Sequence, residues 1–406
     1  MKPVRILVTG GGTGGHVSPA LAVVQTLRKW AETPGAVFSP EFLYLGSETG
    51  IESKLAREAD IPFRSVATGK LRRSSKGILG LVTAANLRDA LRVPVGIGES
   101  FTAVRAFKPD VVLATGGYVS VPPVIAAGFS GVPVLIHEQT VTVGLANKIA
   151  GRFAKRIALS FAESIEELPP PLRKKAVVTG NPVRSIIFGG NRANAASRYG
   201  FVIADDALPC VYVTGGAQGS RIINRAILEV LAELLAFCRI VHQCGKQPEG
   251  TEQDFDRLAA DRAALPDEMK QRYHVTPFVE TSEIGDLFAL ADLIVGRSGA
   301  GTVTEVCALG KPAIFVPLQP ASGDEQMRNA QRLVKIGAAR VIRQEDCNGM
   351  IFLQALRQLL GEPEQLRIMG ESSQTLATPG ATRDLASELL RLVDASFVPP
   401  EDHPPD

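Results

Sequence analysis

Residues 4–16 read VRILVTGGGTGGH, an aliphatic run that leads directly into a glycine-rich turn. The run VRILV predicts a buried β-strand, and the residues after His16 predict a helix. A strand, a glycine turn and a helix in this order are typical of parallel α/β sheets. The glycines in such a turn let backbone N–H groups approach a phosphate at the helix N-terminus. This stretch therefore indicates an α/β fold with a phosphate-bearing ligand.

The same order returns about 200 residues later, where residues 211–220 read VYVTGGAQGS. Two such openings predict two similar α/β domains, joined near residues 180–205, where glycine, asparagine and proline interrupt the pattern. Helix-length segments separate the strands, so both sheets are predicted to be parallel. Ligands of open α/β sheets bind outside the carboxyl ends of the strands, and we therefore expect the active site in the cleft between the domains. The predicted strands are Val4–Val8, Phe42–Leu45, Val111–Ala114, Val134–Ile136, Val211–Val213, Ile240–His242, Leu293–Val295 and Ala313–Val316.

The composition narrows the class of protein. The chain has 406 residues, 45% of them hydrophobic and 21% charged, as expected for globular proteins with two or three domains. It has no run of about 18 apolar residues and no signal-peptide pattern, so we expect neither a membrane span nor secretion. Five cysteines without a CxxC spacing predict neither a disulfide framework nor a zinc site, and they fit a reducing cytoplasm.

Charge is unevenly distributed along the chain. Residues 1–180 hold 22 Lys and Arg against 13 Asp and Glu, whereas residues 181–406 hold 22 against 29. This asymmetry suggests an anionic partner for the first half. The alternative is a chance distribution over two solvated surfaces.

The first glycine loop matches the dinucleotide pattern G-x-G-x-x-G through Gly10, Gly12 and Gly15. That pattern also needs an acidic residue about 20 positions further on. The nearest candidate, Glu32, lies in a stretch that reads as a loop, which weighs against a dinucleotide enzyme. His16 follows the last glycine directly and titrates in the range that suits a general base. A capping or packing histidine is the alternative.

A further glycine cluster, RSGAGTVTE at residues 297–305, follows a predicted strand. Its backbone N–H groups could bind a diphosphate, and Glu305 could accept hydrogen bonds from a ribose diol. The alternative is a capping box formed by Thr302 and Glu305. The stretch DEQMRNA at residues 324–330 predicts a polar turn that leads into a helix, which could equally be an ordinary helix start.

Metal chemistry finds little support in the sequence. The only Asp-x-Asp pair is Asp254-Phe255-Asp256, in a charged stretch expected to be helical, where residues two apart do not face together. A leaving diphosphate would then be stabilised by helix N-termini and arginine. We expect no metal ion and no cofactor.

Seven motifs in order give a more specific indication than any single loop. In this order and spacing they resemble the MurG family, bacterial N-acetylglucosaminyltransferases of peptidoglycan synthesis, and the resemblance extends to about residue 390. The motifs are GGTGGH within residues 10–16, which hold one additional glycine, ATGGYVSVPP at 114–123, HEQ at 137–139, GNPVR at 180–184, GGAQGSRIIN at 215–224, RSGAGTVTE at 297–305 and DEQMRNA at 324–330.

The resemblance implies a GT-B fold of two Rossmann-like domains and an inverting transfer of GlcNAc. The donor would be UDP-GlcNAc and the acceptor the C4 hydroxyl of undecaprenyl-pyrophosphoryl-MurNAc-pentapeptide, with no nucleic acid partner. It also implies an enzyme at the cytoplasmic face of the cell membrane. The expected domains are an acceptor and membrane domain over 1–180, a donor domain over 181–375, a helix over 376–395 that packs back on the first domain, and a disordered tail over 396–406.

The family's site residues can be assigned motif by motif. The resemblance makes His16 the candidate base or acceptor-site residue, places Val279 at the uracil through its backbone, and gives Glu305 the ribose. Contacts with the donor nucleotide, its diphosphate or its sugar are implied for Thr13, Gly14, Gly15, Arg184, Ala300, Gly301, Thr302, Val303, Thr304 and Gln326. Thr140 and Ala217 stand where the family usually has Asn and Ser, so neither is expected to make the usual side-chain contact.

A lipid-linked acceptor requires contact with a bilayer surface. Lys70, Arg72, Arg73 and Lys76 precede an apolar stretch over residues 78–85 whose spacing would place Ile78, Leu81, Val82 and Ala85 on one helix face. Basic residues beside an apolar face predict binding to an anionic membrane. The alternative is that this face packs into the core of the first domain.

The sequence alone does not exclude three other classes of protein. The first is another GT-B enzyme, such as a glycolipid synthase or a UDP-GlcNAc 2-epimerase. The second is a NAD-linked dehydrogenase, and the third is a nucleotide-sugar-binding module without activity.

Overall fold

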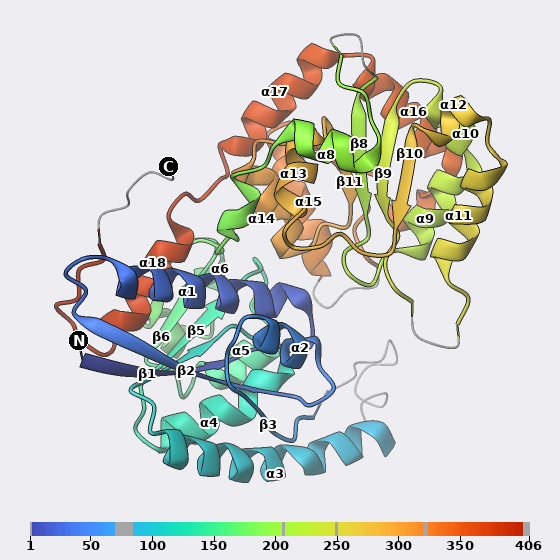
Figure 1. Cartoon of the computed structure of the whole chain (residues 1–406). Helices are drawn as coiled ribbons and strands as arrows, with labels where there is room; N and C mark the ends of the chain where they lie inside the picture. The colour runs from blue at the N-terminus through green and yellow to red at the C-terminus, as the bar shows by residue number, and fades with distance from the viewer. Residues whose placement is uncertain (1, 70–83, 205–207, 248–250, 320–323, 401–406) are drawn as a thin grey trace. The chain divides into compact units, whose positions relative to one another are not determined.

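The computed structural model describes residues 2–69, 84–204, 208–247, 251–319 and 324–400. The contacts between residues divide the chain into two units. Figure 1 shows the whole chain, coloured by residue number. The first unit comprises Met1–Arg184 with Gly380–Asp406, and the second comprises Ser185–Pro379. The boundary predicted between residues 180 and 181 lies close to this division. Each unit has its own sheet and its own apolar core.

The first unit contains a parallel sheet of seven strands in the order β3-β2-β1-β4-β5-β6-β7. Strand β1 pairs with β2 on one side and with β4 on the other, so the strand order reverses between β1 and β4. The four strands predicted for this half are confirmed, with small shifts at their ends. The strands are β1 (Lys2–Thr9), β2 (Phe38–Gly46), β3 (Phe63–Ser65), β4 (Val111–Ala114), β5 (Val134–Glu138), β6 (Arg156–Leu159) and β7 (Ala176–Val178).

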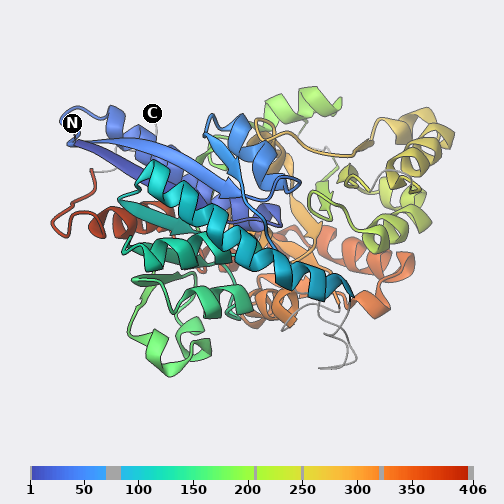
Figure 2. The same ribbon diagram turned by 90° about the horizontal axis from the view of Figure 1, so that it is seen from below.

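Helices cover both faces of this sheet (Figures 1 and 2). Strand β1 shows why, because Val4, Ile6 and Val8 join one apolar cluster while Leu7 joins the other. The first cluster lies under α1 and α18, and the second lies under α3, α4 and α5. The helices of this unit are α1 (Gly14–Glu32), α2 (Ile51–Glu58), α3 (Ala84–Phe107), α4 (Val121–Phe129), α5 (Leu145–Ala150), α6 (Ser164–Glu167), α7 (Pro170–Arg173) and α18 (Ala381–Arg391).

The end of the chain belongs to the first unit. Leu385 and Leu389 of α18 are buried in the same cluster as residues of α1. Beyond the helix, the ring of Phe397 lies 5.8 Å from that of Trp30 and 5.9 Å from that of Phe38. Phe397, which belongs to the tail predicted to be disordered over residues 396–406, therefore packs against the first unit. Residues 401–406 lie outside the described residues.

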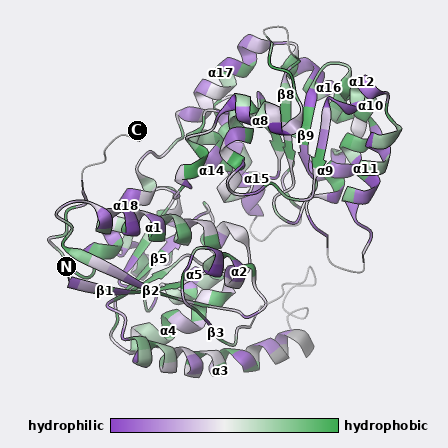
Figure 3. Cartoon of the chain, in the orientation of Figure 1, coloured by the Kyte–Doolittle hydropathy of each residue, from purple (hydrophilic) through white to green (hydrophobic). Residues whose placement is uncertain are grey.

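The second unit repeats the architecture with six parallel strands in the order β10-β9-β8-β11-β12-β13. Its strand order reverses between β8 and β11. The four predicted strands of this half are confirmed, and Figure 3 shows the strands as largely hydrophobic. The strands are β8 (Cys210–Thr214), β9 (Arg239–Gln243), β10 (Tyr273–Thr276), β11 (Leu293–Gly296), β12 (Ala313–Phe315) and β13 (Ala339–Val341).

Ten helices of the second unit are described around this sheet. Helices α9, α10, α16 and α17 bury apolar residues in one large cluster with β8, β9 and β11. Helices α13, α14 and α15 bury apolar residues outside this cluster. No helix in the described part of either unit is long and apolar enough to cross a membrane. The helices are α8 (Arg192–Tyr199), α9 (Arg221–Glu229), α10 (Leu231–Leu235), α11 (Asp254–Ala264), α12 (Asp267–Lys270), α13 (Ile284–Leu290), α14 (Ala300–Ala308), α15 (Glu325–Lys335), α16 (Gly349–Leu360) and α17 (Pro363–Gln374).

Candidate functional site

In the first unit the loops after β1 and β4 meet where the strand order reverses, the place where open α/β sheets bind their ligands. The backbone N–H of Gly11 donates to the carbonyl of Gly116 at 3.2 Å. Gly117 has a φ of +80°, and a Cβ on it would lie 2.1 Å from the carbonyl oxygen of Gly11. Only glycine fits there, so the ATGGY motif is glycine-rich because it packs against the first glycine loop.

The same loop opens helix α1. A Cβ on Gly14 would meet nothing within 4 Å, and one on Gly15 would meet only the Thr13 hydroxyl at 3.8 Å. These two glycines therefore do not serve the packing of the chain. They leave the N-terminus of a 19-residue helix open, with backbone N–H groups that have no partner within the helix. Glu32 is the last residue of this helix, so its assignment to a loop was wrong.

His16 stands in the first turn of α1 and is half-buried. Its Nδ1 lies 2.9 Å from Oε1 of Gln139 and 3.2 Å from the carbonyl oxygen of Thr115. The side chain is thus bound to the ends of β4 and β5. The sequence motif HEQ identified the neighbourhood of Gln139 but did not show that it reaches His16.

A buried carboxylate holds the loop from the other side. Glu52 of α2 accepts hydrogen bonds from the backbone N–H of Gly12 at 3.1 Å and of Ser47 at 3.0 Å. Tyr44 donates to the carbonyl of Gly10 at 2.6 Å, and burial raises the pKa of its phenol far above the ordinary value. The loop that carries Thr13 to His16 is therefore fixed before any ligand binds.

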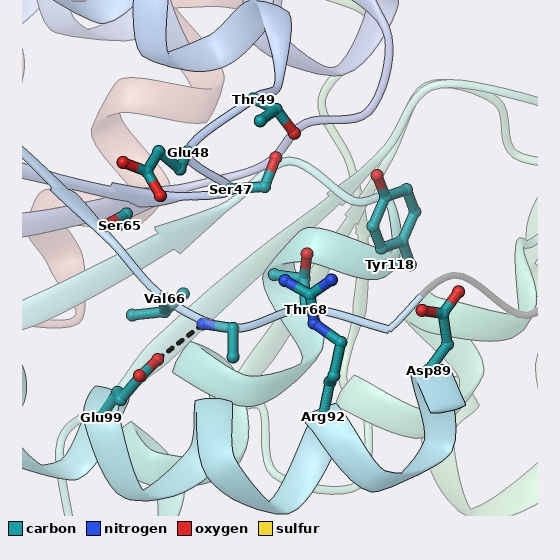
Figure 4. Close-up of a pocket in the computed structure, with 11 residues that line it drawn as sticks. Ser47, Glu48, Thr49, Ser65, Val66, Thr68, Asp89, Arg92, Glu99 and Tyr118 are labelled. Carbon is teal, nitrogen blue, oxygen red and sulfur yellow. Dashed lines mark hydrogen bonds between the residues drawn. The ribbon is translucent and has the colours of Figure 1, made fainter. Parts of the chain in front are cut away.

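A cavity of about 440 Å³ adjoins this loop (Figure 4). Tyr118 forms one wall, and a Cβ on Gly12 would lie 2.9 Å from its ring. Hydroxyl groups and charged side chains dominate the lining, so the cavity suits a polar ligand. None of the sequence motifs indicates this cavity. The lining residues are Ser47, Glu48, Thr49, Ser65, Val66, Ala67, Thr68, Asp89, Arg92, Glu99 and Tyr118.

The second unit brings together another set of predicted residues, again where its strand order reverses. The hydroxyl of Ser298 donates to the carbonyl of Gln326 at 2.8 Å, and Nδ2 of Asn329 donates to the carbonyl of Ser298 at 3.1 Å. These two hydrogen bonds therefore hold the loop after β11 against the start of α15. Oε1 of Gln326 also accepts from the backbone N–H of Leu318 at 3.0 Å.

Helix α14 carries the predicted diphosphate and ribose residues. It begins at Ala300, with Gly299 as its N-cap, and a Cβ on Gly299 or Gly301 would meet nothing within 4 Å. Thr302 is the third residue of the helix and cannot be its N-cap, so the capping-box alternative was wrong. The residues Ala300, Gly301, Thr302, Val303, Thr304 and Glu305 occupy its first two turns, with only Val303 buried.

Both units match known proteins. Residues 6–159 match the family model of the glycosyltransferase family 28 N-terminal domain, and residues 210–385 match that of its C-terminal domain. The UDP-N-acetylglucosamine--N-acetylmuramyl-(pentapeptide) pyrophosphoryl-undecaprenol N-acetylglucosamine transferase of Lachnospira eligens is 35% identical over 372 residues, which cover 91% of this chain and 95% of that protein. This chain belongs to the MurG family.

Other relatives agree with this assignment. A transferase of the same name from Bacillus thuringiensis is 36% identical over 87% of this chain and 91% of its own length. The crystal structure of Acinetobacter baumannii MurG superposes with a TM-score of 0.69 at 27% identity and covers 96% of this chain and all of that one. The UDP-GlcNAc 2-epimerase of Neisseria meningitidis, with a TM-score of 0.63, 15% identity and coverage of 96% of this chain and all of that one, shares the fold alone.

Val279, assigned to the uracil contact through the family resemblance, is buried beside a glutamine that the sequence analysis missed. Oε1 of Gln243 accepts from the backbone N–H of Val279 at 3.3 Å and from the Tyr212 hydroxyl at 3.1 Å. Nε2 of Gln243 donates to the carbonyl of Gly216 at 3.0 Å. This glutamine therefore ties the predicted uracil segment to the glycine loop after β8.

The two departures from the MurG family pattern both lie in ordered loops. The hydroxyl of Thr140 lies 2.8 Å from the carbonyl of Thr142 and 3.1 Å from Oε1 of Glu138, so it is used within its own turn. Ala217 accepts a hydrogen bond from the backbone N–H of Lys246 at 3.3 Å. Arg184 is half-buried and ends the first stretch of the first unit.

The Asp-x-Asp pair lies in the first turn of α11, and the predicted helix is confirmed. Oδ2 of Asp254 accepts a hydrogen bond from Nδ2 of Asn224 at 2.7 Å, so this carboxylate already has a structural partner. Among the residues that the structure describes, no group of three or more His, Cys, Asp or Glu side chains could hold a metal ion.

Proposed function

We propose that this chain transfers N-acetylglucosamine from UDP-GlcNAc to the C4 hydroxyl of undecaprenyl-pyrophosphoryl-MurNAc-pentapeptide, with inversion at the anomeric carbon. The observation that carries the proposal is the 33–36% identity, over most of the chain, to transferases named for this reaction. The fold supports it, since both units present glycine loops and helix N-termini where their strand orders reverse.

In this proposal His16 is the general base. Its imidazole takes the proton of the acceptor hydroxyl while the oxygen attacks the anomeric carbon, and the bond to the diphosphate breaks so that UDP leaves with the electron pair. The open N-terminus of α1 makes Thr13, Gly14 and Gly15 suitable for phosphate or sugar contacts. The cavity bounded by Tyr118 would take a polar part of the acceptor.

The donor would bind to the second unit. Backbone N–H groups of Ala300, Gly301, Thr302, Val303 and Thr304 would stabilise the charge that develops on the leaving diphosphate, with Gln326 beside them and Arg184 as a further donor contact. Glu305 would accept hydrogen bonds from the ribose hydroxyls. The backbone of Val279 would read the uracil.

We further propose that the enzyme works at the cytoplasmic face of the membrane and binds an anionic surface. Of the predicted segment over residues 70–85, residues 70–83 lie outside the described residues. Support comes from the helix that follows it, because Leu91 and Val95 of α3 lie one turn apart and are 69% and 56% exposed.

A transfer assay with labelled UDP-GlcNAc and a soluble analogue of the lipid acceptor tests the activity. The expected product is the disaccharide-bearing lipid, formed only when both substrates are present. UDP-ManNAc formed from UDP-GlcNAc alone would indicate an epimerase and contradict the proposal. His16→Ala should lower kcat by about 10²- to 10⁴-fold with little change in UDP affinity. His274→Gln, in the second unit beside Tyr199, is the control and should leave kcat unchanged.

A further inference from the structure

His16 is connected to a series of hydrogen-bonded, buried polar groups. It runs from His16 through Gln139 to His137 and ends at the carbonyl of Gly180. Gln139 is 2% exposed and His137 is fully buried. Buried polar groups of this kind are costly unless each is paired with a partner of the opposite type, so the order of donors and acceptors is constrained.

The carbonyl of Thr115 fixes that order, because a carbonyl oxygen can only accept. One end of the Gln139 side chain lies 2.6 Å from this oxygen and must therefore be the amide nitrogen. The other end, which lies 2.9 Å from Nδ1 of His16, must be the amide oxygen. Nδ1 of His16 faces this oxygen and the Thr115 carbonyl at 3.2 Å, which are both acceptors.

The hydrogen bonds of His137, at the far end of this series of polar groups, agree with this order of donors and acceptors. Nε2 of His137 lies 3.0 Å from the carbonyl of Gly180, so it carries the proton. Nδ1 of His137 is then free to accept the second N–H of Gln139 at 3.2 Å. Burial lowers the pKa of His137 to about 4, which keeps this ring neutral at physiological pH. A flipped Gln139 would place oxygen against oxygen at Thr115 and two unshared lone pairs together at His137.

We infer that Gln139, supported by His137, is a positioning residue that holds His16 in the tautomer protonated at Nδ1 and so leaves Nε2 as the proton acceptor. The inference rests on the proposed role of His16 in the transfer. Within the described residues, Nε2 of His16 has no hydrogen-bond partner, as this role requires. The amide oxygen of Gln139 fixes the tautomer because it can accept a hydrogen bond from Nδ1 but cannot donate one.

The tautomer can be measured directly by ¹⁵N NMR, since protonated and unprotonated ring nitrogens have well-separated chemical shifts. The His16→Ala variant identifies the His16 signals among the five histidines of the chain. In the wild type at pH 8 we expect a protonated Nδ1 and an unprotonated Nε2. In Gln139→Met, which keeps the size of the side chain, we expect the tautomer protonated at Nε2 to gain population, because Nδ1 keeps only the longer contact of 3.2 Å with the Thr115 carbonyl. A wild-type His16 protonated at Nε2 would overturn the inference, whatever the activity of the enzyme.

Kinetics provide the second measurement. Gln139→Met should lower kcat roughly 10-fold, with the KM for UDP-GlcNAc unchanged, because the ring loses its fixed orientation while the donor site is untouched. Ser160→Ala is the matched control. Its hydroxyl lies 3.4 Å from Nε2 of His137 and donates to the Glu138 carbonyl at 2.7 Å, so removing it leaves the donor order intact and kcat should stay within about twofold.

The possible outcomes separate this inference from the proposed function. If His16→Ala retains full transfer activity, the proposed catalytic role of His16 is wrong. The NMR measurement still tests the tautomer of His16 in that case, because it does not depend on activity. If His16→Ala is inactive but Gln139→Met keeps both the wild-type tautomer and the wild-type kcat, the positioning role of Gln139 is wrong. A fall in kcat with an unchanged tautomer would also contradict it.

Discussion

The buried neutral histidine of the first unit should make that unit sensitive to mild acid. Burial lowers the pKa of His137 to about 4 from an ordinary value of 6.5. Between these two pH values the unfolded chain binds a proton that the folded chain does not, so the free energy of unfolding rises with pH across this window. This contribution is fully present above pH 6.5 and is lost as the pH falls towards 4. From pH 7 to pH 5 the loss amounts to about 2 kcal/mol for this group.

The sole tryptophan allows this loss to be measured in the right place. Trp30 is 7% exposed in the core of the first unit, so its fluorescence reports the unfolding of the unit that holds His137. Urea unfolding followed by this signal at pH 7, 6 and 5 gives the free energy of unfolding at each pH. His137→Gln keeps a group that can donate to the Gly180 carbonyl but does not titrate. The wild type should lose about 2 kcal/mol more than this variant between pH 7 and pH 5.

His242 provides the control, because burial lowers its pKa to about 3 and it belongs to the second unit. If the units unfold independently, His242→Gln should leave the pH dependence of the Trp30 transition unchanged. An effect equal to that of His137→Gln would mean that the units unfold together. Equal losses in the wild type and His137→Gln would refute the reasoning. They would show that the ring of His137 is not held neutral, and Nδ1 of His137 could then not accept the hydrogen bond from Gln139.

Three further predictions concern the reaction and the membrane. Glu305→Ala should raise the KM for UDP-GlcNAc roughly 10- to 150-fold, because a charged hydrogen-bond acceptor is lost, and an unchanged KM in the folded variant would remove Glu305 from the ribose. Transfer should persist in EDTA, since the Asp-x-Asp carboxylate Asp254 is bound to Asn224, and activity restored only by a divalent ion would contradict this. Binding to vesicles should require anionic lipid, fall with salt and weaken when Lys70, Arg72, Arg73 and Lys76 are replaced by alanine. Equal binding by that variant would exclude this segment as the membrane face.

The fold could be predicted largely because its central strands are apolar on both faces. Strand β1 carries the aliphatic residues Val4, Ile6, Leu7 and Val8 because helices cover both sides of the sheet, and such runs are conspicuous in the sequence. The strands that were missed lie towards the edges. β3 reads FRS and β13 reads ARV, each three residues with a charged side chain in the middle. So short a run carries no periodicity, and only pairing with a neighbouring strand makes it a strand.

Some features of the candidate site were also predicted from the sequence, and others were not. Glycine loops that open helices were found from their sequence, because the backbone geometry they need is local. The alternative of a capping box at Thr302 and Glu305 was wrong because the helix begins at Ala300, so Thr302 lies inside it, and helix ends are set by hydrogen bonds rather than by composition. The cavity beside Tyr118 could not be predicted, since its walls come from segments as far apart as Ser47 and Tyr118 in the sequence.

Two glutamines that received no role from the sequence suggest a signal that sequence reasoning can use. Gln139 follows β5 directly and Gln243 ends β9, and each is preceded closely by a buried histidine, His137 and His242 respectively. A glutamine buried at the carboxyl end of a parallel strand is tolerated only if both ends of its amide are bonded. The partners available there are the loops that bind ligands, because those loops leave the same edge of the sheet. In both units the amide does bond to such a loop, at Thr115 in one and at Gly216 in the other. A glutamine beside a histidine at the end of an apolar strand therefore predicts a hydrogen bond to one of these loops, even when no motif assigns the glutamine a role.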